Sequence, residues 1–367
     1  MPLSCVRASE NMQRKADHIH TALSEDVEFH AVTAGFERYR FVHEALPEID
    51  RAEVDTSTTL FGRRLSIPFI ISPMTGGTPA AAEYNRRLAQ AAQRFGIAMG
   101  VGSQRVALEN PALADTFRVR DLAPDILLFA NLGAVQLNNG CGVESCARAV
   151  EMIEADALML HLNPLQECMQ PCGNTNFRKL SERIADVCAG LDVPVVVKEV
   201  GHGISAATAG LLLDAGVDGI DVAGAGGTSW AKVEECRASA RESSSPGGSL
   251  GEWGIPTVDS LCAVRSAAPD AIVIASGGIR TGEDIAKSIA LGADAAGAAL
   301  PLLRAAAASQ EALNAGIAQL KEELATVMFC TGSTTIDDLR RCASLVHAPG
   351  SRGDSSLPRM TPESFPK

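Results

Sequence analysis

Two glycine-rich turns in this sequence have the composition of phosphate-binding loops. The more informative one is Ser276-Gly277-Gly278-Ile279-Arg280, at the end of the apolar run 271–279. Glycines let backbone N–H groups approach a phosphate closely, and the N-terminus of a following helix adds a favourable dipole. The second turn is Gly226-Gly227-Thr228. Together they predict phosphate binding, with a plain tight turn between strand and helix as the alternative.

Lys198 lies inside a second apolar run, Val195-Val196-Val197-Lys198-Glu199-Val200. Burial penalises the charged form of a lysine unless an anion lies nearby. A salt bridge to Glu199 is the simplest alternative, but successive residues of a strand point to opposite faces. We therefore expect Lys198 to contact an anionic ligand.

A third group, His161-Leu162-Asn163-Pro164-Leu165-Gln166-Glu167, follows the apolar run 157–164. His161 and Asn163 are two residues apart and share one face of a strand. Glu167 could bind Mg²⁺, which is typically held by one or two carboxylates and by substrate phosphates. The alternative is that Glu167 only interacts favourably with the N-terminal dipole of a helix.

Cations and one aromatic residue complete the set. Arg14, Lys15 and Arg105 are of the types that bind phosphates. By spacing alone, Arg14 and Lys15 fit a solvated, disordered chain terminus better than a phosphate site. Trp230, one of two tryptophans, could cover an apolar substrate or pack beneath the segment that follows it.

The elements that must position these residues alternate regularly from residue 67 onward. Short apolar runs, several of them β-branched as in parallel strands buried on both faces, alternate with helical segments such as 79–94, 205–215 and 282–291. Eight such units predict a single (β/α)₈ TIM barrel, whose active site lies at the carboxyl ends of the strands; a doubly wound sheet is the alternative. The runs are 67–74, 97–103, 125–133, 157–164, 193–200, 219–225, 271–279 and 294–300.

The barrel is expected to span residues 67–347. Residues 1–66 form an N-terminal extension that carries the basic motif, and the barrel region ends in a helical segment. Residues 228–256, rich in Ser and Gly, are expected to form a long loop, and residues 348–367 a flexible tail.

Composition narrows the functional class. The chain has 367 residues, 46% of them apolar, with a formal net charge of −12; this charge argues against nucleic-acid and anionic-membrane surfaces. No apolar stretch reaches the ~18 residues of a membrane span, and residues 1–15 lack the apolar core of a secretory signal. Ten cysteines without a C-x-x-C pair favour reduced thiols in the cytoplasm.

The sequence resembles the type II, FMN-dependent isopentenyl diphosphate isomerases from Arg14 to about Arg341. In that family, reduced FMN acts as an acid/base catalyst at N5 while a double bond moves between isopentenyl and dimethylallyl diphosphate, and NADPH serves only to reduce the flavin. Members form tetramers or octamers. The matching motifs, in order, are RKADHI (14–19), MTGG (74–77), GSQR (102–105), HLNPLQE (161–167), VVKEVGHGIS (197–205), GGTSW (226–230), WGIPT (253–257) and SGGIRTGEDIAKSIALGADAAGAALP (276–301).

The resemblance also implies a role for individual residues. Those implied in catalysis are Gln166, Lys198, His161 and Trp230, and Glu167 is implied as the Mg²⁺ ligand. Those implied to hold FMN are Met74, Thr75, Gly76, Ser103, Asn131, Lys198, Thr228, Gly278, Ile279, Arg280, Ala299 and Leu300. Those implied to face the isoprenoid diphosphate are Arg14, Lys15, His18, Ser103, Gln104, Arg105, His161, Asn163 and Gln166.

Three other functions remain as alternatives. An FMN-dependent 2-hydroxy-acid oxidase needs a histidine base and an arginine after the sixth strand, where the turn 224–230 has neither. Chemistry like that of IMP dehydrogenase needs a nucleophilic cysteine there, and the nearest, Cys236, lies beyond the turn. A non-catalytic flavin-binding sensor would have no use for His161, Gln166, Glu167 and the basic motif together.

Overall fold

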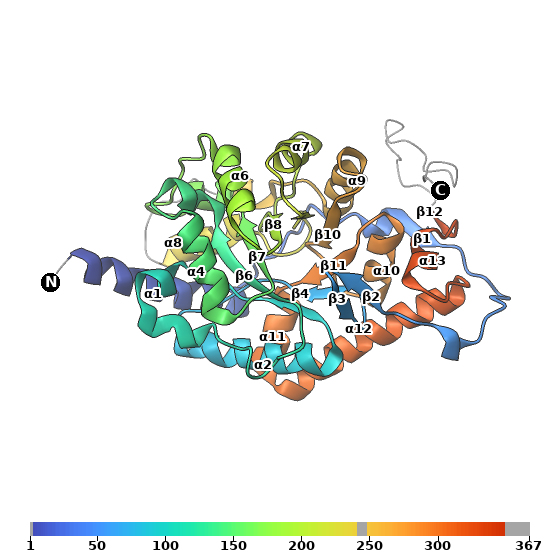
Figure 1. Cartoon of the computed structure of the whole chain (residues 1–367). Helices are drawn as coiled ribbons and strands as arrows, with labels where there is room; N and C mark the ends of the chain where they lie inside the picture. The colour runs from blue at the N-terminus through green and yellow to red at the C-terminus, as the bar shows by residue number, and fades with distance from the viewer. Residues whose placement is uncertain (1–2, 241–247, 349–367) are drawn as a thin grey trace.

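A closed barrel of eight parallel strands forms the centre of the molecule (Figure 1). The computed structural model describes residues 3–240 and 248–348. Each barrel strand falls within one of the eight expected runs, and the last strand pairs with the first, so the (β/α)₈ prediction is confirmed. The strands are β4 (Phe69–Ile71), β5 (Ala98–Gly100), β6 (Leu128–Gly133), β7 (Ala157–His161), β8 (Val195–Lys198), β9 (Gly219–Asp221), β10 (Ile272–Ser276) and β11 (Ala295–Ala298).

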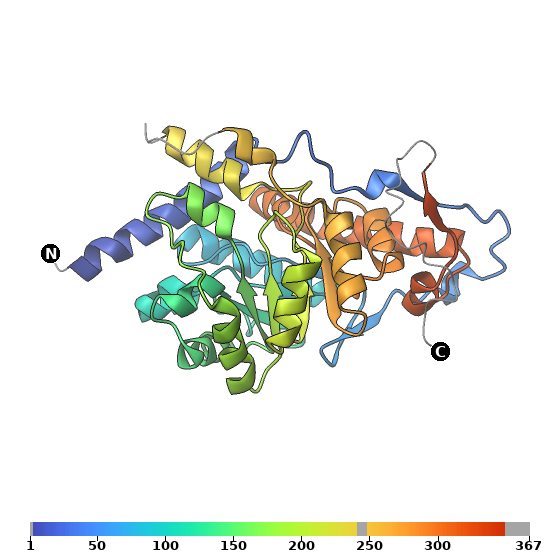
Figure 2. The ribbon, with the colours of Figure 1, turned by 90° about the horizontal axis from the view of Figure 1, so that it is seen from above.

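Helices surround the barrel and cover the outward faces of its strands (Figures 1 and 2). Their inner faces and the outward strand residues form one large apolar core. The α-helices that follow β4, the first barrel strand, are α2 (Pro79–Phe95), α3 (Arg105–Glu109), α4 (Val143–Ile153), α5 (Pro164–Met169), α6 (Leu180–Gly190), α7 (Ala206–Asp214), α8 (Trp230–Ala240), α9 (Thr257–Ala267), α10 (Gly282–Ala290), α11 (Leu300–Ala308), α12 (Gln310–Cys330) and α13 (Ile336–Arg340). Short 3₁₀ helices are η1 (Phe36–Arg38), η2 (Arg51–Glu53), η3 (Pro111–Thr116), η4 (Ala134–Asn138) and η5 (Gly248–Glu252).

The amino end of the barrel is sealed by the hairpin of β2 (Thr58–Leu60) and β3 (Arg63–Leu65). Leu60 and Leu65 are buried in a second apolar cluster together with lumen residues such as Phe129. Phe61, in the turn of the hairpin, meets the Phe129 ring edge-on, with the ring centroids 6.1 Å apart. Because this end is filled by apolar side chains, polar chemistry is confined to the opposite, carboxyl end.

The N-terminal extension is ordered around a long helix, α1 (Leu3–Ser24), which projects beyond the barrel (Figures 1 and 2). The basic motif therefore lies on a helix and not on a solvated, irregular terminus. Further along, β1 (Tyr39–Phe41) pairs antiparallel with β12 (Leu345–His347), so the extension also contacts the C-terminal end of the barrel region.

The prediction of a long loop at residues 228–256 is wrong. This segment contains the 11-residue helix α8 as well as η5. α8 packs against α1 and α5, beside the barrel's carboxyl end and not on the outside of a strand (Figure 2). Most of the Ser-rich stretch and the expected flexible tail lie outside the described residues.

The composition led us to expect reduced cysteines and no membrane span. The nine cysteines from Cys141 to Cys342 are all free. Within the same residues, no helix combines the length and apolar character needed to cross a membrane.

Candidate functional site

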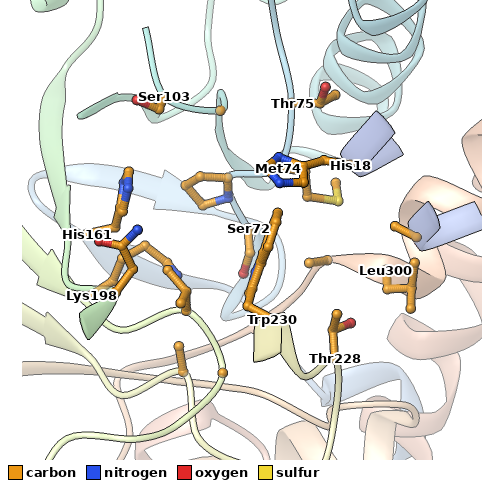
Figure 3. Close-up of a pocket in the computed structure, with 18 of the residues that line it drawn as sticks. His18, Ser72, Met74, Thr75, Ser103, His161, Lys198, Thr228, Trp230 and Leu300 are labelled. Carbon is orange, nitrogen blue, oxygen red and sulfur yellow. The ribbon is translucent and has the colours of Figure 1, made fainter. Parts of the chain in front are cut away.

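A cavity that opens to solvent occupies the carboxyl end of the barrel (Figure 3). Its walls come from the ends of the barrel strands and the loops after them, and α1 contributes Arg14, Lys15 and His18. Figure 3 shows His161 and Lys198 on one side, Thr228 and Leu300 on another, and Trp230 between them. The working face expected from the barrel architecture is therefore where the cavity lies.

Every residue expected to contact cofactor, substrate or metal lines this cavity, with the exceptions of Gly76 and Gln104. The Gln104 side chain is fully buried. Its Nε2 donates to the carbonyl of Ala149 at 2.7 Å, and its Oε1 accepts from the backbone N–H of Asn131 at 3.0 Å. Gly76 packs so closely on Phe117 that a Cβ there would lie 1.9 Å from the ring. In this structure both residues support the wall of the site.

One end of the cavity has the geometry of a phosphate site, which we call the phosphate cup (residues 226–228, 278–280 and 299–300). A Cβ on Gly226, at φ +110°, would lie 2.1 Å from the backbone nitrogen of Ala34, and one on Gly227 would lie 2.5 Å from that of Gly278. Only glycine permits this approach of backbones. Nearby, α11 begins at Leu300 without a side-chain cap. Pro301 has no N–H, and Leu302 and Leu303 donate to the carbonyl of Ala299 at 3.0 Å, so the N–H of Leu300 is the one that remains available to an anion.

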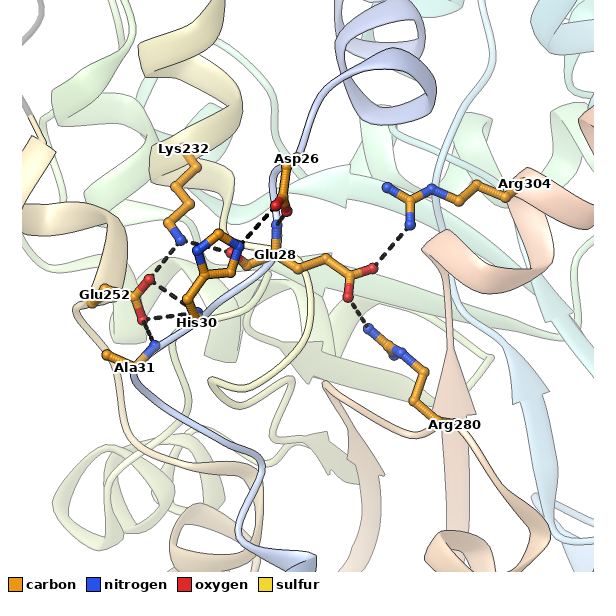
Figure 4. A network of polar contacts seen from close by, with 8 residues as sticks. All are labelled: Asp26, Glu28, His30, Ala31, Lys232, Glu252, Arg280 and Arg304. Atoms are coloured by element: carbon orange, nitrogen blue, oxygen red, sulfur yellow. Dashed lines mark hydrogen bonds and ion pairs between the residues drawn. The ribbon is translucent and has the colours of Figure 1, made fainter.

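A segment that we call the strap (residues 26–32) crosses beside the phosphate cup (Figure 4). Phe29 N–H donates to the carbonyl of Gly227 at 2.9 Å, and Ser229 N–H donates to that of Val27 at 2.8 Å. The Glu28 carboxylate pairs with two cations at the rim, Arg280 at 3.0 Å and Arg304 at 3.2 Å.

The strap is also held from the other side by Glu252, which follows the undescribed stretch 241–247. Its carboxylate accepts backbone N–H groups of His30 and Ala31 at 3.0 Å and of Val32 at 3.2 Å (Figure 4). Lys232 of α8 pairs with the same carboxylate at 2.5 Å and donates to the Glu28 carbonyl at 2.6 Å. α8 therefore helps to fix the strap.

Lys198 is nearly buried on the cavity wall, as its position in β8 predicted, with 6% of its surface exposed. Its Nζ donates to the backbone carbonyl of Glu199. The Glu199 side chain takes no part in that contact, because its Oε2 accepts the backbone N–H groups of Val200, Gly201 and His202. The expectation that Glu199 would be poorly placed for a salt bridge agrees with this geometry.

His161, at the end of β7, is held in its neutral form. Its Nδ1 lies 3.0 Å from Oδ1 of Asn131; because that oxygen only accepts, Nδ1 carries the hydrogen and Nε2 is left as an acceptor. Burial, together with the nearby charges of Lys198, Lys15 and Arg105, lowers the pKa of His161 from 6.5 to about 3. At neutral pH this ring can accept a hydrogen bond but carries no charge.

The Glu167 carboxylate lies against the side-chain amide of Asn163. Glu167 accepts from Nδ2 of Asn163 at 3.1 Å and from the backbone N–H of Asn174 at 2.6 Å. Oδ1 of Asn163 is buried without a hydrogen-bond partner. Carboxylate and amide oxygens suit Mg²⁺. No cluster of three or more His, Cys, Asp or Glu side chains able to hold a metal occurs in residues 3–240 and 248–348, so a metal here would need further ligands, such as phosphate oxygens.

The cations of α1, Arg14 and Lys15, lie with Arg105 of α3 in a second group of charges on the cavity wall, made of other residues than the phosphate cup. Lys15 Nζ donates to the carbonyl of Ser103 at 2.7 Å and lies 5.1 Å from the centre of the Phe117 ring. Burial and the neighbouring charges of Arg14 and Arg105 lower the pKa of Lys15 to about 7. Three crowded cations of this kind are stabilised when an anion binds among them.

A buried carboxylate, Glu234 of α8, was missed by the sequence analysis. It accepts from, or pairs with, His18 Nε2 at 2.8 Å and accepts from Gln166 Nε2 at 3.2 Å, and it forms an ion pair with Arg237. The His18 ring meets Trp230 edge-on at 5.1 Å between centroids. Glu234 and Arg237 stand three residues apart, as on one helix face, but the segment was expected to be a loop.

The fold and the cavity place the chain in a class of flavin enzymes. The family model described as FMN-dependent dehydrogenase matches residues 8–115 and 161–345, and the chain belongs to this family. Within it, the chain is 54% identical to an isopentenyl-diphosphate delta-isomerase of Nostoc sp., over 92% of this chain and 97% of that protein. It is also 54% identical to the enzyme of that name from Synechococcus sp., over 90% and 94%.

The solved structures agree on the fold. A mandelate oxidase superposes with a TM-score of 0.62 at 21% identity, covering 92% of this chain and 100% of the other. The arrangement of the barrel is therefore shared well beyond the isomerases.

Proposed function

We propose that this protein is an isopentenyl-diphosphate delta-isomerase that interconverts isopentenyl and dimethylallyl diphosphate with the help of bound FMN. The observation that carries the proposal is one cavity with two separate anion-binding groups, the phosphate cup and the cations of α1. An FMN phosphate and a substrate diphosphate require two such groups. The relatives of that name, at 54% identity over nearly their whole length, support the same activity.

The residues present fit FMN. The phosphate cup supplies close backbone approach and an uncapped helix N-terminus, and Ser72 Oγ is a buried hydroxyl without a partner in the described residues. Met74, Thr75, Asn131 and Lys198 supply the rest of the wall expected to face the cofactor. In its reduced form, FMN would supply the acid/base group for moving a proton to and from the substrate.

The chain's own residues would bind the substrate and keep water out. Arg14, Lys15 and Arg105 would hold the diphosphate. The edge-on pair of His18 and Trp230 offers an apolar surface to the isoprenoid carbons. An alkene is a very poor base, so proton transfer to it demands positioned groups in a dry pocket.

Gln166 is a further candidate for orienting the reacting end of the substrate. Its side chain lines the cavity and donates to Glu234 at 3.2 Å. Neutral His161 would act as a hydrogen-bond acceptor through Nε2 and not as an acid.

Three finer expectations belong to the same proposal. Mg²⁺ would be held by Glu167 and by the substrate diphosphate, with the unpartnered Oδ1 of Asn163 as a neighbouring oxygen. NADPH would reduce the flavin without being consumed in each turnover. We also propose a homo-oligomer, a tetramer or octamer, in the cytoplasm, where a reducing environment suits the free cysteines.

The 2-hydroxy-acid oxidase alternative gains no support from the site. The turn after β9 contains neither histidine nor arginine, and the likeness to a mandelate oxidase concerns the fold alone. Cys236, which an IMP-dehydrogenase-like mechanism would require in the site, does not line the cavity. A simple flavin sensor would not need the buried Glu234 pairing or the cations of α1.

Two measurements test the proposal. Flavin released from the purified or reconstituted protein should be FMN, because the cavity has one phosphate cup and the sequence has no dinucleotide fingerprint in its first βα unit; FAD or no flavin would end the proposal. An anaerobic assay in D₂O should then place deuterium in the product while the reduced-flavin spectrum persists. Full activity of the oxidised protein, or one NADPH consumed per turnover, would contradict it.

A further inference from the structure

At the floor of the cavity, five neighbouring barrel strands present a half-ring of residues to the lumen, four of them polar. Lys198 ends β8, Asp221 ends β9 and Ser276 ends β10, while Gly297 lies in β11 and Ser72 follows β4. The strands are consecutive around the barrel, and Lys198 pairs in register with Asp221, as Ser276 does with Gly297. The apolar filling of the amino end therefore gives way to polar residues at the floor of the cavity.

Asp221 is a charged member of this half-ring to which the proposed function gives no role. It is 1% exposed and does not line the cavity. Its Oδ1 accepts from Ser276 Oγ at 2.6 Å and from the backbone N–H of Ala223 at 3.2 Å. A carboxylate buried this deeply is costly unless its charge is matched, and Lys198 on the neighbouring strand carries the opposite charge.

The contacts of Asp221 favour its ionised form. Ser276 and Ala223 both donate to it, and the third neighbour is Lys198, which pairs in register with Asp221 on the adjacent strand. Burial raises the pKa of Asp221 above its usual value, and Lys198, Ser276 and Ala223 offset only part of that rise.

The hydrogen bond to Asp221 also determines what Ser276 offers to the cavity. A serine hydroxyl has one hydrogen, and that of Ser276 points at Asp221. Ser276 therefore faces the cavity as an acceptor only. Gly297 separates Ser276 from Ser72: a Cβ on this glycine would lie 2.7 Å from Ser72 Oγ and 3.2 Å from Ser276 Cβ. The Ser72 hydroxyl has no hydrogen-bond partner within the described residues and is free to donate.

We propose that Asp221 is a positioning residue of the flavin site, which acts as the counter-charge of Lys198 and holds Ser276 as a hydrogen-bond acceptor. The proposal rests on the proposed binding of FMN. Lys198 favours the more electron-rich reduced flavin, and Asp221 moderates that effect. The two residues therefore act on the flavin with opposite sign.

Opposite shifts of the flavin reduction potential in variants of Asp221 and Lys198 would distinguish this proposal from a purely structural role of Asp221. In the reconstituted holoenzyme, Asp221→Asn should raise the two-electron reduction potential, because the field of Lys198 is no longer offset, whereas Lys198→Met should lower it. At a fixed dye potential we expect the ratio of reduced to oxidised flavin to change about tenfold in each direction, which corresponds to about 30 mV for a two-electron couple. Ser276→Ala should weaken FMN binding with little change in potential.

A matched control is Asp218→Asn. Asp218 precedes the same strand at the opposite, amino end of the barrel, where it is exposed and accepts the backbone N–H of Val195 at 2.8 Å. Its replacement should leave the potential unchanged. An equal shift in this control would mean that the effect of Asp221→Asn is not specific to the half-ring, and would overturn the proposal.

Two outcomes with Asp221→Asn would also overturn it: a potential equal to that of the wild type, or a shift in the direction of Lys198→Met. Should Asp221→Asn fail to fold, the double variant Asp221→Asn/Lys198→Met carries the test, because it leaves neither charge buried alone. It should have a higher potential than Lys198→Met, and equal potentials would refute the pairing. Wild-type protein that binds no FMN or has no isomerase activity would instead count against the proposed function, so the two failures are distinguishable.

Discussion

Replacing His161 by glutamine should make the FMN-free protein less sensitive to acid. The pKa of His161 is lowered to about 3 in the folded chain, first by burial and then by the charges of Lys198, Lys15 and Arg105. In the unfolded chain the pKa of histidine is about 6.5. Between these two values the unfolded state binds the extra proton, so stability falls as the pH falls from 6.5 towards 3 and is fully present above 6.5.

The size of the effect follows from the two pKa values. At pH 5.0 the unfolded state gains about 2 kcal/mol from protonation of this one residue, whereas at pH 7.5 it gains about 0.1 kcal/mol. Part of the ring faces the cavity, which opens to solvent, and solvent screens the neighbouring charges. We therefore expect about 1–2 kcal/mol. Glutamine keeps a donor for Asn131 but cannot take up the proton.

The assay is urea unfolding of wild type and His161→Gln at pH 7.5 and 5.0. The loss of unfolding free energy on acidification should be smaller in the variant by about 1–2 kcal/mol. His43→Gln is the control, since His43 is exposed and does not line the cavity; it should behave as the wild type. NMR of ¹⁵N-labelled histidine gives a direct check. The reasoning would be refuted by a His161 that titrates near pH 6.5, or by equal acid sensitivity in variant and wild type.

The remaining predictions concern the metal, the buried ion pair and the phosphate cup. Glu167→Gln should weaken the dependence of activity on added Mg²⁺ while FMN stays bound; loss of the flavin absorbance, or full activity in EDTA, would speak against Glu167 as the ligand. Glu234→Ala should lower the unfolding free energy by about 3–5 kcal/mol, because Arg237 would be left buried with its main partner gone; a loss below about 1 kcal/mol in urea titrations would show that the pair is not buried in solution. Gly226→Ala should abolish FMN binding, measured by flavin fluorescence, because the added Cβ would lie 2.1 Å from the backbone nitrogen of Ala34, just after the strap. Gly210→Ala in α7, with nothing within 4 Å, is its control and should stabilise the protein by up to about 1 kcal/mol without affecting FMN.

The barrel could be predicted because its strands are buried on both faces and therefore read as continuous apolar runs. The expected runs were longer than the strands, as at residues 67–74 around β4 (Phe69–Ile71), because apolar residues continue into the loops that line the cavity. The walls of the site followed from the barrel rule that polar residues at carboxyl strand ends converge. At the carboxyl ends of the strands, the sequence pattern of each run and the barrel architecture therefore pointed to the same residues.

The parts that could not be predicted depend on contacts between distant segments. α8 lacks a strong apolar face, because it packs on α1 and α5 and buries the polar Glu234 in place of an apolar stripe. Asp221 was visible as a carboxylate in a strand, but its partner Ser276 lies 55 residues away. The inward turn of Gln104 onto Asn131 likewise depends on packing across the barrel, which residue type and position along a strand do not specify.

The contacts of the strap determine how late during synthesis the phosphate cup can form. It lies near the N-terminus, yet it pairs with residues 227–229 and, through Glu28, with Arg304, which is 276 positions further along the chain. The phosphate cup is therefore complete only when nearly all of the chain has left the ribosome, and this closure is among the most non-local contacts of the fold. A ligand stabilises only the state that binds it. Bound FMN would thus assist the last step of folding and none of the earlier ones, and a nascent chain lacking β11 and α11 would gain nothing from a cell rich in the cofactor.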